Sequence, residues 1–121
     1  MANVLVADDE ELARFTIREI LEGEGHTVIE AKNGVEAIAL FNKNKIDIIV
    51  TDIIMPDKEG IETIIELKRD HPAIKIVAIS GGGRTRNLDF LELAKRYGAD
   101  AVLAKPFSEQ ELIDALNKLL A

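Results

Sequence analysis

Five short apolar runs divide the chain, and each is followed by a stretch whose apolar residues recur at helical spacing. The runs cover residues 4–7, 26–31, 46–51, 74–79 and 101–104. Continuous Val and Ile runs of this length are typical of strands that are buried on both faces of a parallel sheet. Because strands alternate with helices, the sequence predicts an α/β fold of five βα units with helices on both sides of the sheet.

The helices are expected between these runs and after the last one. Their apolar residues fall within residues 10–22, 35–41, 61–68, 88–97 and 112–120. Ser108 and Glu111 form the S-x-x-E pattern of a capping box, which predicts the start of the last helix. The first, third and fourth strands are the most apolar, so they are predicted to lie at the centre of the sheet.

Composition limits the class of protein. The 121 residues suit one domain, which we place at residues 1–121, and 47% hydrophobic residues are enough for a packed core. The net charge of −7 makes direct nucleic-acid binding unfavourable, because phosphate contacts need a basic face. No segment approaches the roughly 18 consecutive apolar residues of a membrane helix. The chain enters its first strand without a signal peptide, so we expect a cytoplasmic protein with no membrane contact.

Polar side chains stand where the predicted strands end. Asp8 and Asp9 follow the first strand, Asp52 ends the third, Ser80 ends the fourth and Lys105 follows the fifth. Parallel strands place all of their carboxyl ends at one edge of the sheet, where ligands bind in open α/β folds. The sequence therefore predicts that three carboxylates, one hydroxyl and one ammonium converge there.

This combination of groups favours a magnesium site that handles a phosphoryl group. Three carboxylates repel one another, and a divalent cation with oxygen ligands is the simplest way to offset that repulsion. The three Asp residues and Lys105 sum to a charge of about −2, which Mg²⁺ would neutralise. Lys105 and the Ser80 hydroxyl could contact phosphoryl oxygens, and Asp52 could accept the group, since carboxylates form acyl-phosphates in enzymes.

The ordered set of these residues resembles the receiver domain of response regulators in two-component signalling. The resemblance covers the chain from Ala2 onward and rests on Asp8-Asp9, Asp52-x-x-Met55-Pro56-x-x-x-Gly60, Ser80 and Lys105-Pro106-Phe107. It implies a flavodoxin-like (βα)5 fold, a doubly wound parallel five-stranded sheet in the order 2-1-3-4-5. It also implies a cis peptide bond before Pro106.

The resemblance assigns a role to each site residue. Asp52 is expected to be the phosphoryl acceptor, Ser80 the switch hydroxyl and Lys105 the invariant lysine. The expected metal ligands, for Mg²⁺ with Mn²⁺ as an alternative, are Asp8, Asp9, Asp52 and the backbone carbonyl of Ile54. A receiver of this kind catalyses its own phosphorylation and dephosphorylation without being a conventional enzyme.

The expected partners follow from the same resemblance. A sensor histidine kinase or a histidine phosphotransfer protein would donate the phosphoryl group, docking on Leu12, Arg14, Phe15, Pro106 and Phe107. Phosphorylation would change the face formed by the fourth helix, strand 101–104 and the last helix, and so control a downstream target or an effector domain. The receiver could be a monomer or a phosphorylation-dependent dimer, and it could stand alone or belong to a longer regulator.

One position departs from the family pattern. Val102 stands three residues before Lys105, where the family usually has an aromatic switch residue. The segment Gly81–Gly83 could move instead, because glycine leaves the backbone unrestricted, and Arg84 and Arg86 would then reposition.

Two other functions stay open at this stage. The first is an interaction module that works without phosphorylation, which the valine at position 102 favours weakly. The second is a Mg²⁺-dependent phosphatase or hydrolase, although such enzymes usually carry a second acid where this chain has Ile54. Simpler roles are also open, namely helix capping for Asp8 and Asp9 and a structural ion pair between Lys105 and Asp52.

Overall fold

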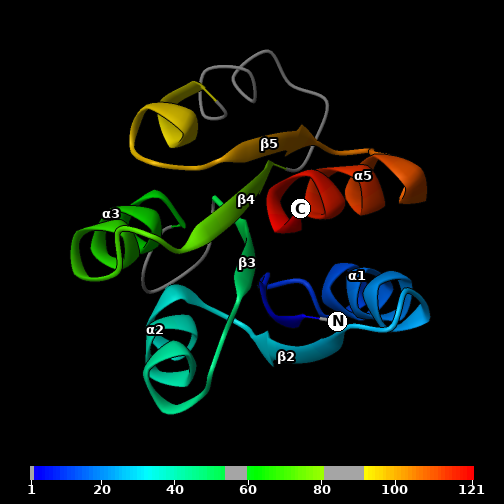
Figure 1. The fold of residues 1–121 in the computed structure, drawn as a ribbon, viewed down its shortest axis with the longest axis horizontal. Coiled ribbons are helices and arrows are strands. Elements are labelled where there is room, and N and C mark those ends of the chain that lie inside the picture. The colour runs from blue at the N-terminus through cyan, green and yellow to red at the C-terminus, as the bar shows by residue number, and fades with distance from the viewer. Residues whose placement is uncertain (1, 54–59, 81–91) are drawn as a thin grey trace.

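Five parallel strands form a single sheet in the order β2-β1-β3-β4-β5 (Figure 1). The structure is a computed structural model that describes residues 2–53, 60–80 and 92–121. The strands are β1 (Asn3–Ala7), β2 (Thr27–Ala31), β3 (Ile48–Asp52), β4 (Lys75–Ser80) and β5 (Ala101–Ala104). The predicted fold class, strand order and central placement of the first, third and fourth strands are therefore confirmed.

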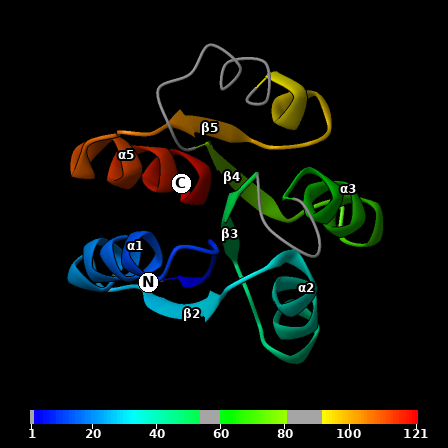
Figure 2. The same cartoon turned by 180° about the vertical axis from the view of Figure 1, so that it is seen from behind.

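Helices cover both faces of the sheet. They are α1 (Glu11–Gly23), α2 (Gly34–Lys43), α3 (Gly60–Asp70) and α5 (Glu109–Leu120), and residues 92–96 are also helical. In Figures 1 and 2, α1 and α5 lie on one side of the sheet, and α2 and α3 lie on the other. The two views show the sandwich from opposite sides, with β2 and β5 as the outer strands.

Alternate residues of each central strand enter two separate cores. In β1, Leu5 and Ala7 pack in the core beneath α2 and α3, whereas Val4 and Val6 pack in the core beneath α1 and α5. All four side chains are fully buried. A strand covered on both faces has no solvent side, which explains why the strand reads as an unbroken apolar run.

The predicted helix boundaries hold where the structure describes them. Ser108 accepts a hydrogen bond from the Glu111 amide, and the Glu111 side chain accepts one from the Ser108 amide, so the predicted capping box is present. In the fourth predicted helix, Ala94 is buried and the chain turns at Gly98, which has a φ of 125°. The N-terminal half of that helix lies outside the described residues.

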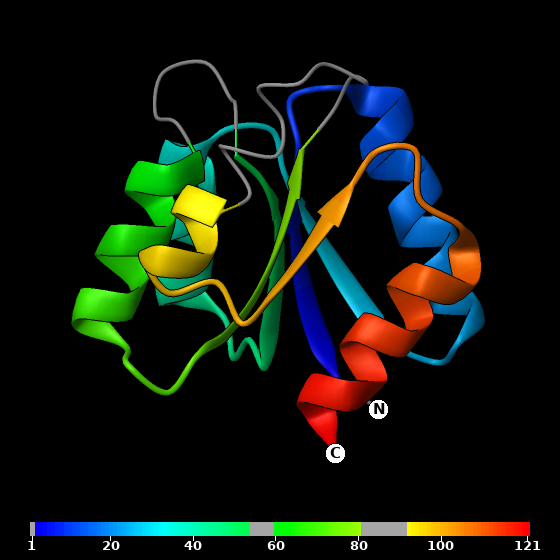
Figure 3. The same ribbon diagram turned by 90° about the horizontal axis from the view of Figure 1, so that it is seen from above.

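The strands point their carboxyl ends toward one edge of the sheet. Figure 3 shows this edge at the top of the view and the two chain ends at the opposite edge. The register aligns Ala7 with Thr51, Asp52 with Ile79 and Ser80 with Ala104. The residues that end or follow these strands therefore meet at one edge, as predicted.

Within residues 2–53, 60–80 and 92–121, no helix combines the length and the apolar character needed to cross a bilayer.

Candidate functional site

Three carboxylates meet at the carboxyl edge of the sheet. Asp8 and Asp9 follow β1, and Asp52 is the last residue of β3. One oxygen from each lies within 4.8 Å of the others. Asp8 is fully buried and Asp52 is 6% exposed, whereas Asp9 is open to solvent. The structure thus brings together the acids that the sequence placed at this edge.

Lys105 supplies a positive charge to this acid cluster. Its Nζ lies 2.9 Å from Asp8 Oδ2, 3.6 Å from Asp52 Oδ2 and 3.9 Å from Glu10 Oε1. Burial is the largest single influence and disfavours the charged ammonium, but the hydrogen bond with Asp8 and the nearby negative charges together outweigh it, so the pKa of Lys105 lies above its usual value. The charges of Asp52 and Glu10 act in the same direction. Lys105 therefore pairs with Asp52, as considered from the sequence, but its shorter contact is with Asp8.

Both carboxylate oxygens and the backbone amide of Asp8 form hydrogen bonds. Its Oδ1 accepts a hydrogen bond from the Glu10 amide at 2.9 Å, and its Oδ2 accepts one from Lys105. Its backbone amide donates to the Ala31 carbonyl at 3.1 Å. The hydrogen bond to Asp8 Oδ1 satisfies the amide of Glu10, which is the N-cap residue of α1 and whose own side chain does not cap the helix. A capping role and membership of the acid cluster therefore coexist in Asp8.

Ser80 and Lys105 approach the site from neighbouring strands. Ser80 is the last residue of β4 and is fully buried. Its backbone carbonyl accepts a hydrogen bond from the Lys105 amide at 2.7 Å. This bond extends the pairing of β4 with β5 by one step, so the hydroxyl and the ammonium come from adjacent backbone segments. The peptide bond between Lys105 and Pro106 is cis, which confirms that expectation.

The backbone of Asp52 is supported by Thr51, to which the sequence assigned no role, and by Gly60, which belongs to the family motif. The Thr51 hydroxyl is fully buried and donates to the Asp52 carbonyl at 2.9 Å. Gly60 begins α3 directly against this strand end, and its amide donates to the Ile53 carbonyl at 3.1 Å. A Cβ at Gly60 would collide with the Asp52 carbonyl oxygen and the Ile53 Cα. The sequence signal was a glycine that follows a strand-end acid and opens a helix.

Some of the predicted residues lie outside the part of the chain that the structure describes. They are Ile54 with its carbonyl, Met55, Pro56, the Gly81–Gly83 segment, Arg84 and Arg86. Val102 is described, is partly buried and packs against the core beneath α2 and α3.

Comparison with known proteins decides the family. The family model for the response regulator receiver domain matches residues 4–117. The chain belongs to the response regulator receiver family of two-component signalling. Among its relatives, the chemotaxis protein CheY of Halobacterium salinarum is 35% identical over 117 residues, which is 97% of this chain and 95% of that protein.

Other relatives contain the receiver as part of a longer chain. The transcriptional regulatory protein CpxR of Klebsiella pneumoniae is 33% identical over 120 residues, and the match covers 99% of this chain but 50% of CpxR. A crystal structure of a response regulator receiver domain protein from Clostridium thermocellum is similar with a TM-score of 0.91 and 33% identity, covering 99% and 94% of the two chains. This chain therefore spans nearly all of some relatives and half of others.

The donor atoms of the acid cluster fit a hard divalent cation. Receiver domains generally bind Mg²⁺, and Mg²⁺ prefers carboxylate and carbonyl oxygens together with water. Asp8, Asp9 and Asp52 offer oxygens only, and the solvent-open Asp9 leaves room for water ligands. The residues present can therefore hold the ion that the family uses.

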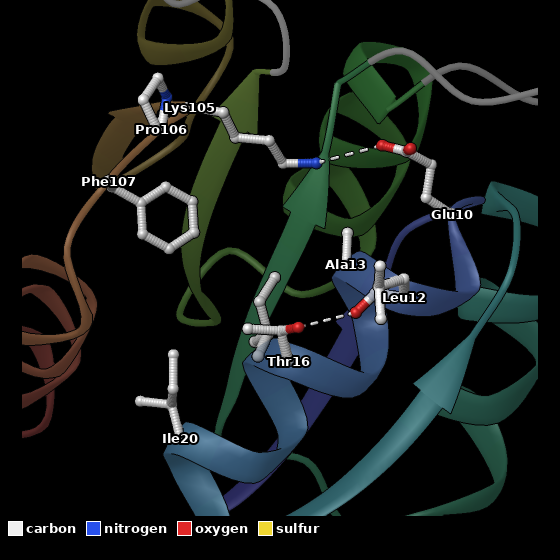
Figure 4. Close-up of a pocket in the computed structure, with 9 residues that line it drawn as sticks. Glu10, Leu12, Ala13, Thr16, Ile20, Lys105, Pro106 and Phe107 are labelled. Carbon is white, nitrogen blue, oxygen red and sulfur yellow. Dashed lines mark hydrogen bonds and ion pairs between the residues drawn. The ribbon is translucent and has the colours of Figure 1, made fainter.

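An apolar groove of about 440 Å³ runs from the site along α1. Figure 4 shows Leu12, Thr16 and Ile20 of α1 facing Pro106 and Phe107 across this groove. Glu10 and Lys105 close its end nearest the acid cluster, where a dashed line marks their ion pair.

Two side chains at the start of α1 did not join the core. Leu12 is 76% exposed and Phe15 is 53% exposed, although both match the helical spacing. Arg14, which the family resemblance placed on the same docking surface, turns instead toward Asp8 and Glu30.

Proposed function

We propose that this receiver domain is a phospho-acceptor switch in which Asp52 takes a phosphoryl group from a phosphohistidine. The observation that carries the proposal is the meeting of three carboxylate oxygens within 4.8 Å of one another beside the Lys105 ammonium. Such a cluster has little structural value by itself, since like charges this close destabilise a fold. It is well suited to a site that must hold a cation and a phosphoryl group together.

The transfer is an in-line displacement at phosphorus. An oxygen of Asp52 forms the new P–O bond while the P–N bond of the phosphohistidine breaks, and the imidazole nitrogen keeps the electron pair and takes up a proton. Asp52 lies at the end of a buried strand, and its backbone is supported by the Thr51 hydroxyl and by close packing against Gly60. This support fixes the nucleophile, which is how positioning lowers the barrier.

Asp8, Asp9 and Asp52 would hold Mg²⁺, or Mn²⁺ in its place, and the Ile54 carbonyl is the proposed fourth protein ligand. The bound ion supplies charge neutralisation for the phosphoryl oxygens. Lys105 supplies a second positive charge, and the Ser80 hydroxyl, from the adjacent strand end, donates a hydrogen bond to the same group. The same groups would serve the later hydrolysis, so the domain catalyses its own phosphorylation and dephosphorylation.

The phosphoryl donor is proposed to be a sensor histidine kinase or a histidine phosphotransfer protein. The exposed Leu12 and the groove lined by Pro106 and Phe107 adjoin Lys105, so a helix seated there would carry its histidine to the acid cluster. The proposed output is a change in the face formed by the fourth helix, β5 and α5, which would control a downstream target or an effector domain.

The setting of the switch is also part of the proposal. We propose that the domain works in the cytoplasm without membrane contact. Direct nucleic-acid contact is not part of the proposal, because the net charge of −7 disfavours binding to phosphates. Its proposed state is a monomer that could dimerise on phosphorylation.

Incubation with acetyl phosphate and Mg²⁺, followed by intact mass measurement, tests this function. We expect a gain of one phosphoryl group that disappears in Asp52→Asn and without Mg²⁺. Asp47→Asn is a matched control, because Asp47 is an exposed carboxylate close to the opposite edge of the sheet, before β3. Absence of phosphorylation in the wild type would favour the interaction module, and rapid turnover of unrelated phosphate esters would favour a hydrolase.

A further inference from the structure

We propose that Arg14, held in place by Glu30, is a positioning residue that fixes the Asp8–Asp9 peptide for metal binding. The inference rests on the proposed function, because it concerns how the same acid cluster is prepared for its cation. Neither residue is part of the cluster itself, and Glu30 comes from the outer strand β2.

The Arg14 guanidinium joins two elements through two different nitrogens. Its Nη1 donates to the Asp8 carbonyl oxygen at 2.8 Å, and its Nε donates to Glu30 Oε1 at 2.9 Å. The Arg14 side chain is 15% exposed and the Glu30 side chain is 25% exposed. A largely covered arginine with both contacts at short distance has far less conformational freedom than a surface arginine.

The accepting carbonyl belongs to the peptide group that connects the two acids. Because a peptide group is planar, the direction of the Asp8 carbonyl also sets the positions of the Asp9 nitrogen and Cα. The amide on the other side of Asp8 is fixed by the Ala31 carbonyl. The backbone of Asp8 is therefore anchored before and after its Cα, and the second anchor is the Arg14 side chain.

This anchor matters most for Asp9. Asp8 is fully buried, and its carboxylate has the Glu10 amide and Lys105 as partners. Asp9 is exposed, so packing restricts it less. Arg14 thus acts on the member of the acid pair whose carboxylate most needs a fixed backbone to stay within reach of Asp52.

The effect is geometric rather than one of charge. Glu30 neutralises the guanidinium, and its own pKa is lowered first by the hydrogen bond from Arg18 and further by the one from Arg14. A lysine at position 14 would keep the charge but offers one nitrogen in place of a planar fork. We therefore expect Arg14→Lys to lose most of the effect.

Arg18 provides a matched control on the same helix. Its Nη1 donates to Glu30 Oε2 at 2.7 Å and its Nε to Glu22 at 3.0 Å, so it shares the carboxylate with Arg14. Arg18 follows Arg14 by one helical turn, and its described contacts do not include the Asp8 carbonyl. Removing Arg18 perturbs the ion-pair cluster without touching the Asp8–Asp9 peptide.

The test is calorimetric titration of the full chain with Mg²⁺ alone, compared among wild type, Arg14→Gln, Arg14→Lys and Arg18→Gln. We expect Arg14→Gln to weaken Mg²⁺ binding about tenfold, the lower end for loss of a residue that orients a metal ligand. Arg14→Lys should weaken it almost as much, and Arg18→Gln should stay within about twofold of wild type. In the metal-free protein, we expect faster hydrogen exchange of the Asp9 amide in Arg14→Gln than in Arg18→Gln.

The outcomes separate this inference from the function on which it rests. Equal Mg²⁺ affinity in wild type and Arg14→Gln, with wild type still phosphorylated by acetyl phosphate, would overturn the role of Arg14 alone. Equal weakening in Arg14→Gln and Arg18→Gln would overturn it too, because the effect would follow general stability. A wild type that binds no Mg²⁺ and is not phosphorylated would overturn both. If Arg14→Gln does not fold, Arg14→Lys decides by the same criteria.

Discussion

Replacement of Gly60 by alanine tests whether α3 packs directly on the backbone of the acceptor strand. The added Cβ would lie 2.8 Å from the Asp52 carbonyl carbon, and it would collide outright with the Asp52 carbonyl oxygen and the Ile53 Cα. The carbonyl-carbon contact alone is about 1 Å shorter than the optimum of 3.5–4.0 Å between carbon atoms. All three are backbone atoms, so no side-chain rotation can relieve the overlap.

The energetic cost follows from that geometry. Overpacking by one methylene costs about 1–3 kcal/mol, and the rigid surroundings place Gly60→Ala near the upper end. Alanine regains at most about 1 kcal/mol through its better helix propensity. A net loss of about 2 kcal/mol corresponds to a fall in Tm of roughly 10 °C for a chain of this length.

Urea unfolding followed by far-ultraviolet circular dichroism would measure the loss of stability. Because the same contact supports the Asp52 backbone, we also expect slower phosphorylation of the folded variant by acetyl phosphate. Gly23→Ala is the control, since a Cβ on this last residue of α1 meets nothing within 4 Å. That variant should be unchanged or slightly more stable. A Gly60→Ala protein as stable as Gly23→Ala would refute the close packing.

Three further predictions concern charges and caps. Lys105→Met should destabilise the metal-free protein by about 3 kcal/mol, because the fully buried Asp8 carboxylate loses its positively charged partner. In thermal unfolding, added Mg²⁺ should therefore stabilise the variant more than it stabilises wild type. Hydrogen bonds from Arg18 and Arg14 lower the pKa of Glu30, so the stability it contributes is present above its unfolded pKa of about 4.3 and is lost as the pH falls through its lower folded value. Glu30→Gln should therefore lose less stability than wild type between about pH 5 and pH 3, measured by urea midpoints. Ser108→Ala should cost about 1 kcal/mol through loss of the capping box, seen as a lower Tm.

The sequence was sufficient to predict the order of elements and the contents of the sheet edge. The apolar runs, and the helical spacing of the apolar residues between them, identify parallel strands. Parallel topology then places the residues after β1 and at the end of β3 close together, independently of side-chain conformation. For this reason the sequence alone predicts that Asp8, Asp9 and Asp52 lie close together. The cis peptide at Lys105–Pro106 came from the family resemblance instead, because nothing in periodicity reports a peptide isomer.

The contacts that hold the site in place could not be predicted in the same way. Arg14 matched a surface position on α1, and only the three-dimensional path of β2 shows that Glu30 lies beside it. Gly60 looked like a turn residue, whereas its importance comes from the distance between a helix start and a strand backbone. Leu12 and Phe15 are apolar yet stayed exposed, because they lie on the opposite side of α1 from its buried residues, Ile17 and Leu21.

The position of Lys105 connects the proposed chemistry with the docking groove. In the structure the Lys105 ammonium lies closest to the Asp8 carboxylate, and it offsets part of the negative charge of the acid cluster. A cation bound by Asp8 would weaken that attraction, and a phosphoryl group on Asp52 would offer Lys105 a more strongly anionic partner. Lys105 would then move from one anion to the other. Because Pro106 and Phe107 follow it directly and line the groove along α1, that movement would also alter the surface where we place the phosphoryl donor. Loading of Asp52 and release of the donor would be coupled through one short segment.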